Sequence, residues 1–124
     1  MGRAPGWNSG ISVQTKGKSN MKNMCTVIAC FYAKPEKALE LEKILQNFVV
    51  QTRQESGCVN YDLHKSNDDP NVFVFYENWR SREDWDVHNQ RPFLTSFLEK
   101  RTDYLTKEIE VTTYTMLSEY NKGS

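Results

Sequence analysis

Apolar and β-branched residues gather in a short run at residues 25–33, CTVIACFYA, which is typical of a central β-strand. Lys34 and Pro35 end this run, and Pro35 followed by Glu36 suits the first turn of a helix. The apolar residues that follow recur at intervals of three and four, which predicts an amphipathic helix of about 20 residues that ends at Ser56 and Gly57. Its inward side chains are Leu41, Ile44, Leu45, Phe48, Val49 and Thr52.

Two further strands are predicted, at residues 58–65 and 72–79. The segment between them, SNDDPN, is dense in turn-forming residues, so the two strands should form a hairpin. Side chains in a strand alternate between its two faces. One face of residues 72–79 therefore carries Phe73, Phe75, Glu77 and Trp79, and the other carries Val72, Val74, Tyr76 and Asn78.

Helical signals return after this hairpin. Ser81 is a suitable N-cap, with Asp84 as a capping-box partner three residues later. The predicted helix carries Trp85 and His88 on neighbouring turns of one face. Pro92 predicts a break near residues 89–91, followed by more helix to about residue 105. Alternation over residues 109–118 predicts a last strand.

This order of elements predicts an α+β fold, a ferredoxin-like βαββαβ antiparallel sheet. Two helices on one face of the sheet leave the other face bare, and both candidate faces of residues 72–79 are substantially apolar. A bare apolar face requires a cover. We expect a homodimer in which two sheets form a shared, dimeric α+β barrel. The domain should span residues 21–120, between a disordered or expression-derived extension (residues 1–20) and a short tail (residues 121–124).

Composition and charge narrow the partners. A chain of 124 residues indicates one domain, and 16 Lys plus Arg balance 16 Asp plus Glu. Without a basic excess, nucleic acid is not an expected partner. Three cysteines are too few for a disulfide scaffold, and Cys25 and Cys30 lack the spacing of a zinc site. No apolar run could span a bilayer and no secretory signal is apparent, so we expect a cytoplasmic protein without membrane contacts.

Residues 26–117 resemble the antibiotic biosynthesis monooxygenase (ABM) family, and most of all its small bacterial quinol monooxygenase subgroup. The residues that carry the resemblance are Gly57, Tyr61, Leu63, Asp69, Pro70, Phe75, Glu77, Trp79, His88 and Phe93. The resemblance implies a dimeric barrel of ferredoxin-like subunits. It also implies that O₂ oxidises an electron-rich aromatic, such as a hydroquinone, with no cofactor: neither flavin, haem nor metal.

Oxygenation of this kind needs a dry apolar pocket, a proton acceptor, and donors that hold the phenolate and the developing peroxide. His88 is the first candidate base, because free imidazole titrates near neutrality. Glu77 is the second catalytic candidate; it could orient His88, or accept a proton itself if burial raises its pKa. The substrate-binding candidates are Trp79, Phe75, Tyr61, His64 and Phe93. His64 is the weakest of these, since it lies on the opposite strand face from Tyr61.

Structural roles remain open for the same residues. Trp79 and Phe75 could be core or dimer-interface residues, His88 could simply bond to Glu77, and Glu77 could pair with a nearby arginine. Other enzymes also use this fold. Haem degradation expects an asparagine on the first strand, which CTVIACFYA lacks. A phosphosugar isomerase would need Arg53 or Arg91 in the pocket. A dimer that binds an aromatic ligand without turnover is the third alternative.

Overall fold

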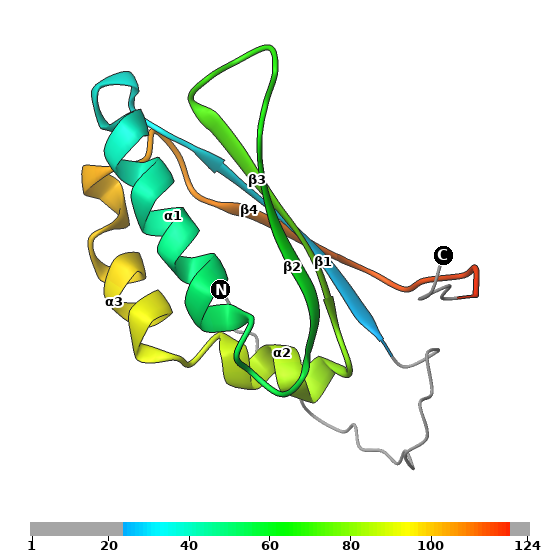
Figure 1. The fold of residues 1–124 in the computed structure, drawn as a ribbon. Coiled ribbons are helices and arrows are strands. Elements are labelled where there is room, and N and C mark those ends of the chain that lie inside the picture. The colour runs from blue at the N-terminus through cyan, green and yellow to red at the C-terminus, as the bar shows by residue number, and fades with distance from the viewer. Residues whose placement is uncertain (1–23, 120–124) are drawn as a thin grey trace.

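Four antiparallel strands form one twisted sheet in the computed structural model, which describes residues 24–119 (Figure 1). The strands are β1 (Cys25–Tyr32), β2 (Cys58–Lys65), β3 (Val72–Trp79) and β4 (Glu110–Tyr114). Their spatial order is β2-β3-β1-β4, with every neighbouring pair antiparallel. This is the ferredoxin-like α+β arrangement predicted from the sequence.

All helices described lie on one side of this sheet (Figure 1). They are the 3₁₀ turn Pro35–Lys37 leading into α1 (Ala38–Thr52), then α2 (Arg82–His88), α3 (Pro92–Glu99) and the 3₁₀ turn Arg101–Asp103. The break between α2 and α3 falls where Pro92 predicts it. The predicted continuation of α3 to residue 105 is wrong. Lys100 leaves the helical region (φ −119°, ψ 21°), and the chain then bonds to the end of β1, with the Thr106 amide donating to the Tyr32 carbonyl at 2.9 Å.

The last strand is also shorter than residues 109–118. β4 has only β1 as a neighbour among the described strands, and Tyr114 already lies opposite Thr26, one residue from the start of β1. Beyond Tyr114 there is almost no partner strand left to accept backbone hydrogen bonds. The alternating sequence pattern extends to residue 118, but backbone pairing with β1 ends at Tyr114.

The hydrophobic core lies between the sheet and the helices. Phe73, Phe75, Glu77 and Trp79 all face the helices and are at most 3 % exposed. β1 adds Val27, Ala29 and Phe31 to the same face. Burying a side chain such as phenylalanine stabilises the fold by roughly 2 kcal/mol. The opposite sheet face is therefore the bare one, and it carries half-buried and exposed side chains that include Ile28, Val74, Tyr76 and Tyr114.

The turn between α1 and β2 packs tightly on the start of α2. A Cβ atom on Gly57 would lie 2.3 Å from Cγ of Asp84, so only glycine fits at this position. The predicted N-cap is confirmed: the Ser81 hydroxyl accepts a hydrogen bond from the Asp84 amide at 3.1 Å. This close contact brings the α1–β2 turn, which carries Glu55, next to α2.

Residues 24–119 show neither a membrane-spanning helix nor a metal-binding cluster. None of the helices there combines the length and hydrophobicity that a membrane crossing requires. The same stretch contains no group of three or more His, Cys, Asp or Glu side chains arranged to hold a metal ion. The predictions for residues 1–20 and 121–124 lie outside the described part of the chain.

Candidate active site

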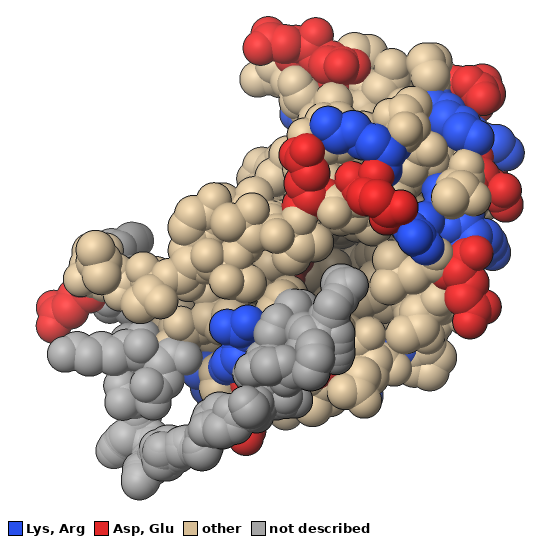
Figure 2. Space-filling view, turned by 180° about the vertical axis from the view of Figure 1, so that it is seen from behind, with Lys and Arg blue, Asp and Glu red and all other residues tan. Residues whose placement is uncertain are grey.

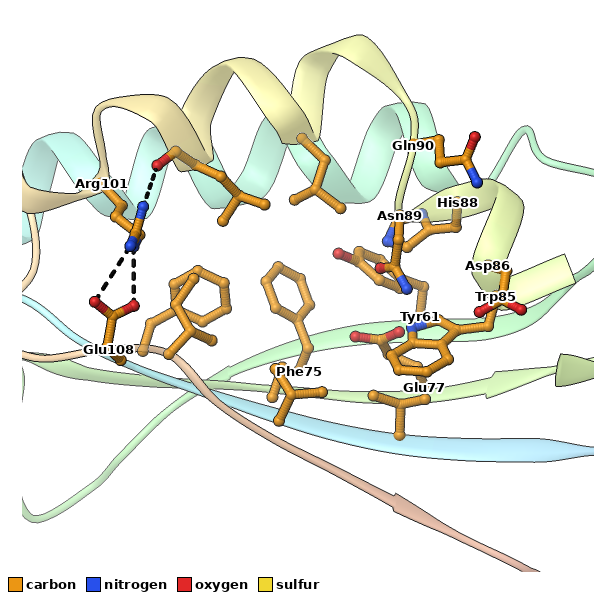
Figure 3. A pocket seen from close by; sticks show the side chains of 17 residues that line it. Tyr61, Phe75, Glu77, Trp85, Asp86, His88, Asn89, Gln90, Arg101 and Glu108 are labelled. Carbon is orange, nitrogen blue, oxygen red and sulfur yellow. Dashed lines mark hydrogen bonds and ion pairs between the residues drawn. The ribbon is translucent and has the colours of Figure 1, made fainter. Parts of the chain in front are cut away.

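A cavity of about 490 Å³ lies between the helix-facing side of the sheet and helices α2 and α3 (Figure 3). Its walls are mostly apolar and come from β1, β3, β4 and α3. The lining residues are Val27, Ala29, Phe31, Tyr61, Phe75, Glu77, Trp85, Asp86, His88, Asn89, Gln90, Leu94, Leu98, Arg101, Glu108, Ile109 and Val111. The acidic and imidazole groups Glu77, Asp86 and His88 gather at one end, and Arg101 with Glu108 lies at the other (Figure 3).

Glu77 is a carboxyl group buried in the floor of this cavity. It projects from β3 and is 3 % exposed, and the indole N–H of Trp79 donates to its Oε1 at 2.9 Å. Loss of hydration raises the pKa of Glu77 from 4.5 to about 8; the Trp79 hydrogen bond opposes this shift, and the negative charge of Glu55 adds to it. Glu77 is therefore mostly protonated at neutral pH and can both donate and regain a proton there.

His88 is the last residue of α2 and is 3 % exposed. Its Nδ1 lies 3.0 Å from Oε2 of Glu55, whose Oε1 is 3.3 Å from Nε of Arg91. A carboxylate on Nδ1 favours the tautomer with the proton on that nitrogen, which leaves the lone pair on Nε2. The hydrogen-bond partner of His88 is thus Glu55, and the expectation that Glu77 orients His88 is corrected.

Aromatic rings enclose the reactive end of the cavity. Tyr61 stacks on Phe75 with ring centroids 4.6 Å apart, and its ring centroid is 5.5 Å from that of His88. The Trp79 ring lies 4.6 Å from the imidazole, centroid to centroid. Burial, together with the charge of Glu77, raises the pKa of Tyr61 well above its usual value, so its hydroxyl stays protonated. A flat aromatic ligand would meet apolar ring faces here.

The sequence from residue 24 to residue 100 matches the family model described as antibiotic biosynthesis monooxygenase. This chain belongs to the antibiotic biosynthesis monooxygenase family. The protein Rv0793 of Mycobacterium tuberculosis, which carries the name of a candidate monooxygenase, is 32 % identical over 99 residues, covering 80 % of this chain and 97 % of that protein. Its solved structure has a TM-score of 0.74 and covers 79 % of this chain and 99 % of its own.

Two more relatives support the assignment to the ABM family. The structure of PA3566 from Pseudomonas aeruginosa has a TM-score of 0.74 at 28 % identity, covering 81 % of this chain and 100 % of that one. The uncharacterised protein sll1783 of Synechocystis is 37 % identical over 81 residues, or 65 % of this chain. The chain spans about half, 55 %, of the length of that Synechocystis protein.

The ABM cavity brings together only some of the residues expected from the sequence. His88, Glu77, Phe75 and Tyr61 line it. Trp79 is fully buried behind Glu77 and reaches the cavity only through its contacts with Glu77 and His88.

Two expected substrate-binding residues do not line this ABM cavity, although the Phe93 ring contacts the His88 imidazole with centroids 6.1 Å apart. Phe93 lines a separate groove between α1 and α3, because α3 turns that side chain toward Phe48, with ring centroids 5.4 Å apart. His64 pairs with Val74 across the β2–β3 ladder and is exposed on the opposite sheet face. For this cavity the expectation for both residues is corrected.

Sequence reasoning missed several polar groups of this ABM site. Glu55 contacts His88 from a turn 33 residues earlier, and no periodic pattern marks it. Arg101 donates to Glu108 twice, from Nε to Oε1 at 2.9 Å and from Nη2 to Oε2 at 3.2 Å. None of Glu55, Arg101 and Glu108 lies in a recognisable sequence motif. Arg101 reaches the cavity because α3 ends at Glu99, whereas the sequence pattern predicted helix to about residue 105.

The surface of this ABM protein is mixed in charge. On the face shown in Figure 2, Lys and Arg side chains alternate with Asp and Glu and do not gather into a basic field. This agrees with the balance of 16 basic and 16 acidic residues in the sequence.

Proposed function

We propose that this protein is a cofactor-independent monooxygenase that oxidises a quinol-like or polycyclic dihydroxyaromatic with O₂. One observation carries the proposal: a buried carboxyl with a pKa of about 8, Glu77, and a carboxylate-paired imidazole, His88, face the same apolar cavity. A protonated carboxyl and an imidazole that face one pocket can act as general acid and general base toward a bound ligand. The family assignment points to the same reaction class.

The first step is removal of a phenolic proton by Nε2 of His88. The phenolate passes one electron to O₂, and the resulting radical pair joins through a C–O bond at the neighbouring ring carbon. Glu77 protonates the peroxide. The ring C–H proton then returns to Glu77 while the O–O bond breaks, and the departing hydroxide takes the proton from His88. Hydroquinone and O₂ thus become hydroxyquinone and water, with both side chains restored.

The remaining residues would supply binding and shielding. A volume of about 490 Å³ falls within the usual range for small-molecule sites. Phe75 and Tyr61 offer ring faces for stacking, and the Tyr61 hydroxyl stays protonated, so it can donate to a phenolate. Water-poor walls strengthen each of these hydrogen bonds relative to bulk solvent.

A phosphorylated substrate, as an isomerase would use, has less support. Arg53 donates to Asp62 at 2.9 Å, and Arg91 lies 3.3 Å from Glu55. Arg101, which lines the cavity, is held by Glu108. Each of these guanidinium groups already has a carboxylate partner, so binding a phosphate would require breaking an ion pair.

We also propose that the protein acts as a homodimer through the bare face of its sheet. That face places Ile28, Val74, Tyr76 and Tyr114 side by side on β1, β3 and β4. Tyr76 is 39 % exposed and Tyr114 is 50 % exposed in the single subunit. A second sheet packed on them would remove this apolar area from water.

Labelled oxygen tests the proposed chemistry. Purified protein is incubated with naphthohydroquinone under ¹⁸O₂, and the product is analysed by mass spectrometry. A monooxygenase places one ¹⁸O atom in the hydroxyquinone and one in water. Protein-dependent formation of unlabelled quinone with H₂O₂ would contradict the proposal, because it would show an oxidase reaction.

A further inference from the structure

The end of the cavity away from His88 has its own polar element, which the proposed chemistry does not use. Arg101 lies in the 3₁₀ turn after α3, and Glu108 lies just before β4. Both line the cavity, and their side chains face each other across its far end (Figure 3). We call Arg101 and Glu108 the distal pair.

The strand register shows how far apart the two ends are. Glu77 lies opposite Val27, and Glu110 lies opposite Cys30, so the distal pair is level with the far part of β1. At about 3.3 Å per residue, four to five positions along the strand correspond to roughly 15 Å. Between the two ends the lining is apolar, with Ala29, Phe31, Leu94 and Leu98. Among the side chains that line the far end of the described cavity, the distal pair supplies the hydrogen-bonding groups for a polar end of a long ligand.

The hydrogen bonds of the distal pair define what it can bind. Glu108 accepts hydrogen bonds from two N–H groups of Arg101, and Nη1 of Arg101 donates to the Leu98 carbonyl at 2.8 Å. A guanidinium has five donors, so two remain beyond these three bonds. The Leu98 bond also anchors Arg101 independently of Glu108. The pair lies at the solvent-exposed mouth of the cavity, where the Arg101 and Glu108 side chains are 37 % and 75 % exposed and water screens their charges. Because the carboxylate offsets the guanidinium charge, the pair suits an uncharged hydroxyl or carbonyl, and Glu108 disfavours an anion.

We propose that the distal pair sets substrate specificity: it favours elongated aromatics whose far end bears an uncharged hydrogen-bonding group, and it discriminates against an anionic end. This inference rests on the proposed function for the aromatic nature of the ligand. It concerns binding, so it can be tested without turnover. Glu108 is the residue that enforces the discrimination, because it is the ion-pair partner of Arg101, the only Lys or Arg among the residues that line the described cavity.

The test uses three oxidised naphthoquinones, which do not react with O₂. Each carries a phenyl arm on the second ring to span the cavity, and the para position of that arm bears hydrogen, hydroxymethyl or carboxylate. Kd is measured by titration calorimetry. We expect the wild-type protein to bind the hydroxymethyl compound about tenfold more tightly than the carboxylate. In Glu108→Gln, which frees Arg101, the carboxylate compound should bind at least tenfold more tightly than it does to wild type.

Glu110→Gln is the matched control, since it makes the same chemical change in an ion pair outside the cavity, Lys107–Glu110. It should leave all three Kd values unchanged. Arg101→Met removes the free N–H donors, so it should reduce the preference for the hydroxymethyl over the hydrogen compound, and it should not improve binding of the carboxylate compound. The inference is overturned if Glu108→Gln keeps the wild-type order, if Glu110→Gln reproduces its effect, or if no naphthoquinone binds. The expected binding order together with absent oxygen uptake would contradict the proposed function alone.

Discussion

At the scale of single residues, Glu77 is the side chain expected to make stability depend on pH. Its carboxyl has a pKa of about 8 in the folded protein against 4.5 as its ordinary value. Between these two pH values the unfolded chain has lost this proton and the folded chain has kept it. The free energy of unfolding therefore falls as pH rises from about 4.5 to about 8 and then levels off.

We expect Glu77→Gln to remove this pH dependence, because the neutral amide keeps an acceptor for Trp79 and needs no proton. At pH 9 the variant should be more stable than wild type by as much as roughly 5 kcal/mol, an upper limit from the size of the pKa shift. Urea unfolding of both proteins at pH 5, 7 and 9 measures the effect. Parallel stability curves for the two proteins would show that Glu77 titrates normally in the folded state.

Glu55 is expected to act as a positioning residue for His88. In Glu55→Leu the Nδ1 partner is gone, so the imidazole should lose its single tautomer and kcat should fall by about 10- to 100-fold. Nitrogen-15 NMR reads the tautomer directly. The sequence has only two histidines, and exposed His64 serves as the internal reference.

Glu42→Leu is the control for this experiment, since it makes the same substitution in a more exposed ion pair, to Lys65, away from the site. An unchanged His88 tautomer in Glu55→Leu would refute the positioning role even if activity fell. If kcat fell equally in Glu55→Leu and in Glu42→Leu, the loss would reflect general destabilisation of the fold and not the positioning of His88.

The sequence predicted the residues of the site that sit on regular elements. Glu77 and Tyr61 follow from strand alternation, and His88 follows from its place on a capped helix. Glu55 could not be predicted, because its contact with His88 depends on how a turn packs against α2, and that packing is set by the close approach of Gly57 to Asp84. Strand alternation already placed His64 on the opposite face from Tyr61, and the structure agrees. Phe93 was expected in the cavity because local pattern did not fix the rotation of α3 about its axis.

At the scale of elements, the approach of the α1–β2 turn to α2 is the contact most sensitive to substitution. In Gly57→Ala the new Cβ would lie 2.3 Å from Cγ of Asp84, so the turn must move away. We expect a loss of about 1–3 kcal/mol in the free energy of unfolding and a fall in activity, because Glu55 moves with the turn. Ser56→Ala, at the exposed neighbouring position, is the control. Urea unfolding would contradict this view if both variants matched wild type.

Element boundaries show where local pattern stops being sufficient. β2 and β3 have the predicted limits, since turn residues mark both ends of each strand. The end of α3 depends on contacts that are distant in sequence: Leu105 bridges Ala33, and the Tyr104 carbonyl accepts from the Lys34 amide. These bonds draw the chain toward β1 and away from helical geometry, and no residue near Lys100 encodes them.

At the scale of the whole molecule, the bare sheet face is expected to hold two subunits together. Tyr76→Asp places a charge in the middle of that face and should convert the dimer to monomer, with little effect on the fold of the subunit. Analytical ultracentrifugation gives the mass directly. Leu39→Asp is the matched control, because Leu39 is an apolar residue on α1 with 77 % of its surface exposed. Wild-type protein that sediments as a monomer would refute the proposed interface.

Oxygen uptake by the purified protein with a panel of hydroquinones tests the central claim most directly. The assay contains catalase and no added cofactor, and autoxidation is subtracted. We predict saturable, protein-dependent uptake with at least one hydroquinone, reduced by a factor of about 10² to 10⁴ in His88→Ala and unchanged in His64→Ala. No uptake with any member of the panel, or full activity in His88→Ala, would contradict the account of this cavity as a monooxygenase site with His88 as its base.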